Sequence, residues 1–439
     1  MASTYLTRTF GSAGNSKTFT VSFWFKLGIV PDGTSMNTIG SGTDNTNDFM
    51  IGFSYDVART TGIHILARNS GTKVIDVQTN RKFRDVNGWY HAVIAVDTTQ
   101  STDSDRVKIY INGSQETSLL TSTYPSQNTD LRWNTATAHY IGTTRDNQTA
   151  TNLFDGLMAH VNNIDGTAYD ADTFGETDAT TGIWKPKFGP SVTYGTNGFF
   201  LKFENSGAFG TDSSGNSNTF TVNGTMTQTI DTPSNVFTTW NALDKHASST
   251  LSNGNTKYAT SGTSQYEPAK CTLGFSAGKY YSEHQINSLS TTACYIGIYG
   301  TSVSGQSQSE MDTSRFSYNV KNGEIIKNAS NLQTGLATFT TNDILGIEVD
   351  CDAGTLKFYK NGTQVGTTIT DSDISSTEWS FGTQPRLATF SSNFGNGYFG
   401  TTAVSSAQNP DDGIGIFEYD VPTGYRALCT KSINAEEYS

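Results

Sequence analysis

Hydrophobic and polar residues alternate in short runs along most of the chain, which is the pattern of half-buried β-strands. In the run at 18–26, every second residue is apolar and falls on one face of a strand: Phe19, Val21, Phe23 and Phe25. Trp24 falls on the opposite face, where it can serve the other side of the sheet or an interface. This run therefore predicts a strand with one apolar face.

Similar runs recur about every 8–12 residues, with turn residues rather than helical patterns between them. Two of them end on Asn-Gly, at 112–113 and 361–362, which is the strongest short signal for a tight β-hairpin. Expected strands lie at 48–55, 62–68, 88–97, 106–114, 139–142, 156–166, 199–203, 279–286, 293–299, 344–350 and 354–362. One short helical turn is expected at 170–175. The sequence thus predicts an all-β protein with two antiparallel β-sandwich (jelly-roll) domains.

Polar stretches divide the chain into these two domains. Residues 207–218 form a loop rich in Gly, Ser and Asn, and 227–241 is an extended segment with a central Pro233. We expect a first sandwich over 1–226, a linker over 227–241, a second sandwich over 242–430 and a C-terminal tail over 431–439.

Composition agrees with this architecture and excludes some classes of binding partner. Only 35% of residues are hydrophobic while 12% are aromatic, and 43 glycines stand against 9 prolines, as suits thin sandwiches with many tight turns. The net charge of −12 argues against nucleic acid and anionic membranes as partners. No apolar run approaches the roughly 20 residues that span a bilayer. The N-terminus lacks the basic and apolar parts of a signal peptide, so export by that route is not indicated.

The four cysteines lie in the second half of the chain, at Cys271, Cys294, Cys351 and Cys429. They form no Cys-x-x-Cys pair, and no histidine stands at metal-ligand spacing, so a zinc site is not expected. We expect buried free thiols, and a Cys271–Cys294 disulfide stays open as the alternative.

Both halves resemble known families at these same runs. The first half resembles the laminin-G-like, concanavalin-type sandwich at 19–26, 88–91 (Gly-Trp-Tyr-His), 107–113 and 154–159. The second half resembles a SPRY domain at 278–281 (Gly-Lys-Tyr-Tyr), 296–298, 346–350 and 354–362. The two resemblances imply two binding-type sandwiches in this order.

A narrower resemblance concerns a succession of motifs at 164–168, 172–176, 182–187, 195–199, 212–216 and 231–235, together with the N-terminus at 2–9. This succession is similar to virion proteins of tailed phages, notably those infecting marine bacteria. The resemblance implies a structural protein of fibre, knob or capsid-decoration type, made in the host cytoplasm and carried in the virion. It also implies other virion proteins as partners and a homo-oligomer, with host surface glycans as a further partner class.

Catalytic constellations are not evident, so we expect a protein that is not an enzyme. A retaining glycosidase needs two carboxyl groups about 5–5.5 Å apart, and the nearest candidate is Glu348-x-Asp350-x-Asp352. We interpret Glu348 and Asp350 as the solvent face of an amphipathic strand. No Gly-x-Ser-x-Gly elbow introduces a strand-to-helix turn. A polysaccharide depolymerase is therefore the least favoured alternative, after a host-receptor or polysaccharide-binding tail protein.

Ligand binding has a few candidate residues. Trp133, Trp184 and Trp379 fall in loop-like contexts, where exposed indoles stack on sugars or anchor protein interfaces. No metal or resident cofactor is expected, although calcium is the one ion to weigh. Its candidate ligands are loop carboxylates, which also occur in turns for structural reasons: Asp97, Asp103, Asp105, Asp44 and Asp48.

Overall fold

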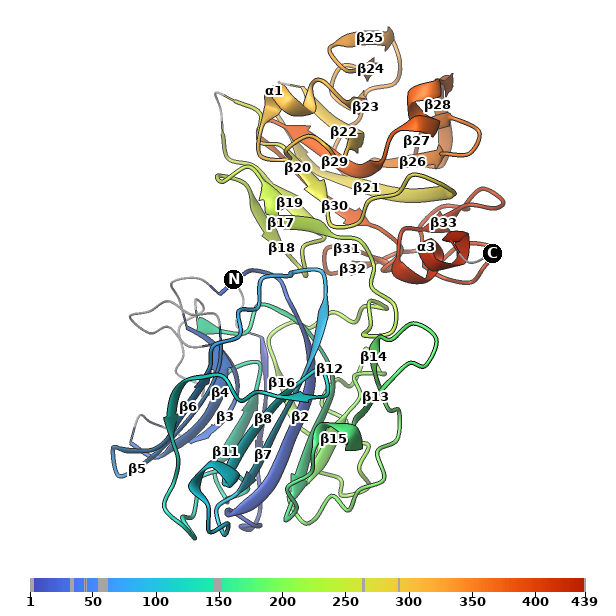
Figure 1. Cartoon of the computed structure of the whole chain (residues 1–439). Helices are drawn as coiled ribbons and strands as arrows, with labels where there is room; N and C mark the ends of the chain where they lie inside the picture. The colour runs from blue at the N-terminus through green and yellow to red at the C-terminus, as the bar shows by residue number, and fades with distance from the viewer. Residues whose placement is uncertain are drawn as a thin grey trace. The chain divides into compact units, whose positions relative to one another are not determined.

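A computed structural model of the chain describes residues 4–31, 35–42, 44, 46–53, 62–144, 152–262, 265–290 and 293–437. They form two compact units, Met1–Gln228 and Thr229–Ser439 (Figure 1). Apart from short helices, the regular structure of the described residues consists of β-strands in mostly antiparallel sheets. This confirms the all-β prediction. The end of the strand predicted at 48–55 and the motif residues 2–3 lie outside the described residues.

The first unit is a sandwich of two sheets. Its larger sheet contains, from edge to edge, β10 (Leu119–Thr123), β6 (Thr72–Thr79), β5 (Ile63–Asn69), β4 (Asp48–Phe53), β3 (Met36–Gly42), β11 (Ala138–Ile141), β1 (Tyr5–Thr9) and β16 (Thr221–Asn223). Its smaller sheet contains β15 (Phe199–Leu201), β12 (Gly156–Asp165), β2 (Thr18–Leu27), β7 (Trp89–Asp97), β8 (Val107–Ile111) and β9 (Ser114–Gln115). A 3₁₀ turn, η1 (Asp103–Asp105), precedes β8.

The core of the first unit lies between these sheets. All four alternating apolar residues of β2 are buried in it, as predicted, and Phe19 and Phe25 contact Phe49 and Phe53 of β4 across the sandwich. Trp24 points to the other face of β2, where its ring stacks on His91 of β7 with centroids 4.7 Å apart.

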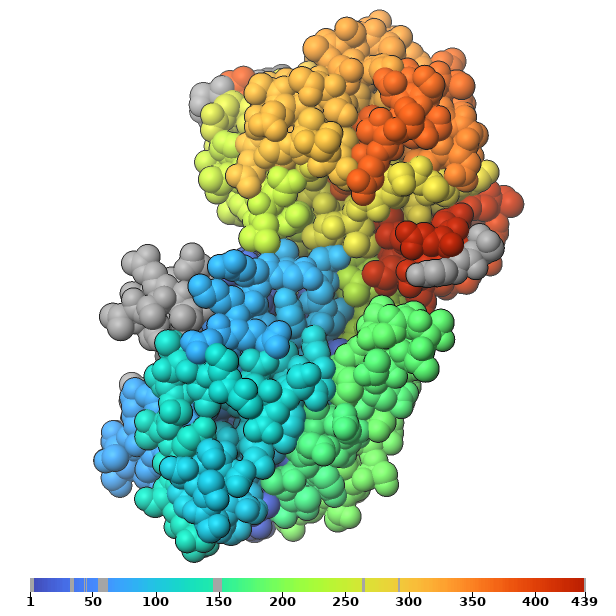
Figure 2. Space-filling model, in the orientation of Figure 1, coloured from blue at the N-terminus to red at the C-terminus, as the bar shows by residue number. Residues whose placement is uncertain are grey.

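That outer face is covered by residues 166–198, which we call the arm. The arm contains the predicted helical turn as η3 (Ala171–Thr173) and a hairpin of β13 (Gly175–Thr177) and β14 (Trp184–Pro186). Its apolar side chains form a second cluster with Val93 and Ile164 of the sheet. The arm appears in green on the surface in Figure 2.

The second unit is also a sandwich of two sheets. One contains β17 (Trp240–Lys245), β20 (Ala269–Cys271), β29 (Trp379–Pro385), β22 (Cys294–Gly300), β23 (Arg315–Asn319), β24 (Glu324–Lys327) and β25 (Ser330–Gln333). The other contains β18 (Thr250–Ser252), β19 (Lys257–Ala259), β30 (Ala388–Asn393), β21 (Lys279–Leu289), β26 (Ile344–Asp350), β27 (Thr355–Lys360) and β28 (Thr363–Thr370). Two short helices, α1 (Gln308–Met311) and α2 (Ser372–Ser376), lie in connections.

Residues 398–437, which we call the strap, pack on the outer face of the second of these sheets. The strap contains β31 (Tyr398–Phe399), β32 (Thr402–Ala403), β33 (Arg426–Ala427) and α3 (Thr430–Glu437). β33 pairs in parallel with the start of β21. An apolar cluster joins the strap to the sheet and to the start of the unit: Phe237, Tyr281, Phe417, Val421, Tyr425, Ala427 and Cys429.

The two ends of the second unit are hydrogen-bonded to each other. Phe237 and Cys429 form an antiparallel bridge, Thr238 N–H donates to the Leu428 carbonyl at 3.0 Å, and Thr430 N–H donates to the Val236 carbonyl at 2.9 Å. Parts of the segments predicted as linker and tail therefore contribute to this unit.

Both Asn-Gly turns form the predicted two-residue hairpins, joining β8 to β9 and β27 to β28. All four turn residues have positive φ (48° and 85° at Asn112 and Gly113, 49° and 77° at Asn361 and Gly362), as a type I′ turn requires. The four cysteines are buried free thiols, as predicted. Among the described residues, no helix is both long and apolar enough to cross a bilayer.

Candidate functional site

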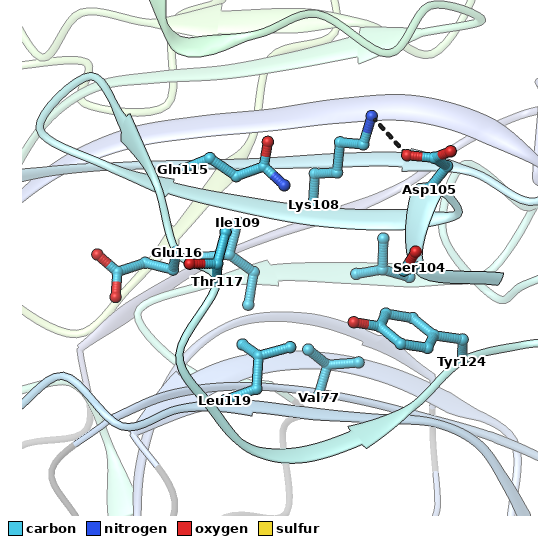
Figure 3. A pocket seen from close by; sticks show the side chains of 11 residues that line it. Val77, Ser104, Asp105, Lys108, Ile109, Gln115, Glu116, Thr117, Leu119 and Tyr124 are labelled. Carbon is cyan, nitrogen blue, oxygen red and sulfur yellow. Dashed lines mark ion pairs between the residues drawn. The ribbon is translucent and has the colours of Figure 1, made fainter. Parts of the chain in front are cut away.

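The first unit has a hollow at one open side of its sandwich. β10 ends the larger sheet there, and β9, paired with β8, ends the smaller one. The hollow has a volume of about 230 Å³ and lies between these strands (Figure 3). Its lining comes from β6, η1, β8, β9, β10 and the residues around them: Val77, Ser104, Asp105, Val107, Lys108, Ile109, Gln115, Glu116, Thr117, Leu119 and Tyr124.

The floor of the hollow is aliphatic. Val77 of β6 and Val107 and Ile109 of β8 are buried residues of the core between the two sheets. Leu119 and Tyr124 are partly buried and pack against that core. In Figure 3 the hydroxyl end of Tyr124, rather than the face of its ring, points into the hollow. Burial, with the nearby Asp103 carboxylate, raises the pKa of Tyr124, so this hydroxyl stays protonated at neutral pH.

The rim of the hollow is polar, and its charges are paired. Lys108 Nζ lies 3.0 Å from Asp105 Oδ1, and Arg81, beside the hollow, lies 2.7 Å from Glu116 Oε1. Gln115 and Thr117 are exposed on the same rim. Because Val77, Val107 and Ile109 are only 1–3% exposed, the surface that the hollow offers is mainly polar and carries no net charge.

Sequence reasoning did not identify this site. Leu119–Thr123 was not among the expected strands, although its Leu-Leu-Thr-Ser-Thr run is rich in residues that favour strands. That run was the one available signal. The closure of the hollow also depends on Val77 of β6, which is distant from β10 in sequence.

The structure does not bring the three predicted tryptophans together. Trp133 lies in the core of the first unit, where it is fully buried and its Nε1–H donates to Asn163 Oδ1 at 2.8 Å. Trp379 begins β29 of the second unit, is 2% exposed and donates to the Ile374 carbonyl at 3.0 Å. The prediction that these two indoles are exposed binding residues is wrong, because both fold inward and fill core space.

Trp184 lies half-buried at the start of β14 in the arm. Its Nε1–H donates to His91 Nδ1 at 3.0 Å, and the two rings stack with centroids 6.1 Å apart. Because an indole N–H can only donate, His91 carries its proton on Nε2 and donates it to Ser22 Oγ at 2.8 Å. Burial lowers the pKa of His91 to about 3, which keeps the ring neutral. Trp184 thus holds the arm against the sheet.

We expect the Trp184→Phe substitution to destabilise the first unit by about 1–2 kcal/mol, because it leaves the buried His91 Nδ1 without a donor. Chemical denaturation followed by tryptophan fluorescence measures this change. The exposed Phe188→Ala substitution in the same arm serves as the control, with no comparable loss expected. A Trp184→Phe variant as stable as the original chain would contradict the role assigned to this hydrogen bond.

The carboxyl groups weighed for glycoside hydrolysis are buried in salt bridges. Glu348 is 1% exposed, accepts a hydrogen bond from Lys357 Nζ at 2.6 Å and another from Tyr359 Oη. Asp350 is 4% exposed and pairs with Lys279 Nζ at 3.0 Å. The interpretation of these residues as a solvent face is wrong. The strap lies over this face of the sheet, and its Tyr425 ring contacts Lys279.

The carboxylates weighed for calcium bind protein groups instead. Asp97 accepts hydrogen bonds from Thr99 and Gln100, Asp44 caps its own turn, and Asp48 pairs with Arg68 at 2.6 Å. Asp105 pairs with Lys108 on the rim of the hollow. In the part of the chain that the structure describes, no three Asp, Glu, His or Cys side chains gather as a metal site.

Comparison with known families now bears on both units. Residues 2–171 match the family model described as the Concanavalin A-like lectin/glucanases superfamily. Residues 279–380 match the model of the SPRY domain. The chain thus contains a concanavalin-like domain at 2–171 followed by a SPRY domain at 279–380. This confirms both resemblances and their order, and it indicates binding of proteins or carbohydrates by β-sandwich surfaces. Domains of these two kinds are typically non-catalytic binding modules.

Three similar solved structures include two that are named for their SPRY domains. The SPRY domain of human HERC1 is 15% identical over 35% of this chain and 96% of its own, with a TM-score of 0.31. The TRIM65 PSpry domain is 13% identical over 35% of this chain and 90% of its own, with a TM-score of 0.29. Stonustoxin is 20% identical over 35% of this chain and 26% of its own, with a TM-score of 0.28. A comparison with curated proteins gives no match.

Proposed function

We propose that this chain is a structural protein of a tailed-phage virion and that its sandwich surfaces contact other virion proteins. The observation that carries the proposal is the ordered motif succession between 164 and 235, which is similar to such proteins. Two binding-type domains in one chain are consistent with this role.

The motif residues have structural contacts that fit a scaffold rather than a reaction site. Asp165 accepts hydrogen bonds from the backbone N–H groups of Asn15 at 2.6 Å and Asn197 at 2.8 Å. Asp212 accepts from the N–H groups of Phe200 and Asn218 at 2.9 and 2.8 Å. These carboxylates fix loops of the first unit, so the motif residues to which they belong have a structural role.

The proposed role also implies where the protein is made and what it assembles with. The chain would be made in the host cytoplasm and assembled into the particle as a homo-oligomer beside other virion proteins, without nucleic acid or membrane insertion. Many copies on one particle make weak individual contacts effective through avidity.

Mass spectrometry of purified particles tests the proposal, with immunogold labelling to place the protein on them. We expect the chain in intact particles at a copy number comparable to other structural proteins, with label over the capsid or the tail. A lysate of infected cells provides the control for expression. If the chain is abundant in the lysate but missing from density-purified particles, the proposed role is wrong.

The match to a lectin-containing superfamily favours one alternative, a tail protein that binds host-surface polysaccharide. Of the three tryptophans proposed for that role, Trp184 alone retains exposed surface. Glycan-array binding that is lost in a Trp184→Ala variant would favour this alternative. The depolymerase alternative loses support because Glu348 and Asp350 are buried in salt bridges.

A further inference from the structure

We propose that the arm of the first unit opens reversibly in mild acid while the sandwich beneath it stays folded, and that protonation of His91 opens it. The ring of His91 joins the arm to the sheet. Opening uncovers the outer face of β2, β7 and β12, which carries Trp24, Val93 and Ile164. This inference concerns the first unit alone and does not depend on the proposed virion role.

The imidazole of His91 is held between groups of the sheet and of the arm. It is fully buried and stacks on Trp24 of β2 with centroids 4.7 Å apart. Its Nε2–H donates to Ser22 Oγ of β2 at 2.8 Å, and its Nδ1 accepts from Trp184 Nε1–H of the arm at 3.0 Å. A neutral ring therefore satisfies one partner on each side.

A protonated ring cannot keep this arrangement. An imidazolium carries an N–H on both nitrogens, and an indole N–H can only donate. The Nδ1–H of His91 and the Nε1–H of Trp184 would then face each other without an acceptor between them. Ser22 can rotate its hydroxyl group and still accept from Nε2–H, but Trp184 cannot change its role. A proton on His91 therefore breaks the contact with the arm rather than the contact with the sheet.

The surroundings of His91 do not compensate an added positive charge. Ionisable side chains on the elements packed around it are Lys26 of β2, Tyr110 of β8, His160 of β12, and Tyr169, Asp170, Lys185 and Tyr194 of the arm. Asp170 is exposed, and Lys185 is paired with Asp178 at 3.0 Å. Burial, and then the charge of His160, lowers the pKa of His91 to about 3.

The arm is attached more weakly than the sandwich is held together. The core between the two sheets includes no arm residue. The separate cluster under the arm has four buried members: Val93, Ile164, Ala171 and Phe174. Tyr169 N–H donates to Thr20 Oγ1 of β2 at 2.7 Å. Among the described strands, β13 and β14 pair only with each other (Figure 1), and such a hairpin is marginal by itself. The arm can therefore open locally.

The direction of the pH dependence follows from the two states of the arm. With the arm open, His91 meets water and has its ordinary pKa of 6.5, whereas with the arm closed its pKa is about 3. Between these two values the open state binds one proton that the closed state does not. The equilibrium constant for opening therefore rises about tenfold for each pH unit of acidification below 6.5. Above that pH the arm stays closed.

Hydrogen exchange of the full chain at pH 7, 6, 5 and 4, read by mass spectrometry and corrected for the intrinsic pH dependence of exchange, tests the proposal. We expect the opening constant of peptides from 166–198 to rise about tenfold per pH unit. At pH 5 it should exceed that of β2 and β7 at least about tenfold. An arm that opens with the same constant as these two strands, or independently of pH, overturns the proposal.

Two matched variants assign the effect to His91. His91→Gln keeps an acceptor oxygen for Trp184 and an N–H for Ser22 but does not titrate, so its opening constant should rise about tenfold less per pH unit than that of the original chain. His64→Gln, which changes a histidine beside Asp76 on the other sheet, should keep the full dependence. Thermal unfolding at pH 7 checks that both variants fold, and the comparison of arm and core strands in the original chain needs neither. An unchanged pH dependence in His91→Gln, or an equal loss in both variants, overturns the proposal.

Discussion

We expect the Glu283→Ala substitution to lower the unfolding temperature of the second unit by about 10 °C, the largest single-residue effect outside the apolar core. Glu283 lies in β21, under the strap, and is fully buried. Its carboxylate accepts hydrogen bonds from the backbone N–H groups of Glu418 and Tyr419, both at 2.9 Å, and from Asn393 Nδ2 at 3.2 Å. One side chain thus fixes the strap to the sheet.

The size of the effect follows from the groups left behind. Alanine removes the acceptor of four donors, the three above and the Tyr281 hydroxyl at 3.3 Å, and an unsatisfied buried donor costs about 1–3 kcal/mol. A loss of about 3–5 kcal/mol corresponds to about 10 °C in a unit of this size. Differential scanning calorimetry measures the change, and hydrogen exchange assigns the transition to the second unit.

Two variants serve as controls for Glu283→Ala. Glu283→Gln keeps one acceptor oxygen and should cost much less, while Glu437→Ala removes an exposed carboxylate from α3 and should cost nothing measurable. A Glu283→Ala variant that unfolds within about 2 °C of the original chain would show that the strap does not depend on this carboxylate.

The second large effect is a loss of stability of the first unit in acid. We expect the first unit to lose on the order of 5 kcal/mol of stability between pH 7 and pH 4 and to unfold before the second unit. Burial lowers the pKa of His91 to about 3 and that of His139 to about 4, from an ordinary value of 6.5. Between pH 6.5 and these lowered pKa values, the unfolded chain binds protons that the folded unit does not. Acidification therefore favours unfolding. The stabilisation is complete above pH 6.5 and is lost as the pH falls towards 4.

In the second unit, two buried groups change the stability in opposite directions as the pH falls. Burial also lowers the pKa of His284 to about 3, with the same sign. Burial raises the pKa of Glu283 from 4.5 to about 7, so the folded unit keeps a proton between pH 7 and 4.5 that the unfolded chain releases. Glu283 therefore gains stability as the pH falls through this window and offsets His284.

Thermal unfolding at pH 7, 6, 5 and 4, with hydrogen exchange to assign each transition, measures the difference between the units. Glu283→Gln provides the control, because without the titrating carboxyl group the second unit should become more sensitive to acid. If the second unit of the original chain loses as much stability as the first, the opposing action of Glu283 is refuted.

Local pattern predicted the strands with clear alternation and both Asn-Gly turns, but it missed several other strands, including β3, β6, β10, β29 and β30. The alternation at Phe19–Phe25 identified the core face of β2, and each Asn-Gly pair predicted its hairpin, because both signals act between near neighbours. The family resemblances rested on the same local runs. The order of the two sandwiches followed from them.

Burial by distant segments could not be predicted in the same way. Glu348 has the alternation of an exposed position, but the strap, about 70 residues further on, covers it. Trp133 lies in an irregular segment, yet it fills the core because loops of a thin sandwich also contribute large side chains to it. All residues that line the hollow except Val77 lie between 104 and 124, but the pattern along that run does not show that its two ends face each other.

The hydrogen-bonded ends of the second unit determine how it responds to mechanical tension. Residues 236–238 and 428–430 run antiparallel, with the Val236–Thr430 pair nearest to both ends of the second unit. A force applied at those ends reaches this pair first and then the next, so the bonds break one after another rather than all together. Unzipping of this kind needs less force than shearing a set of bonds loaded at once. Under tension the strap would separate from the sheet at low force while the sandwich strands keep their pairing. The unit would therefore lengthen before it unfolds.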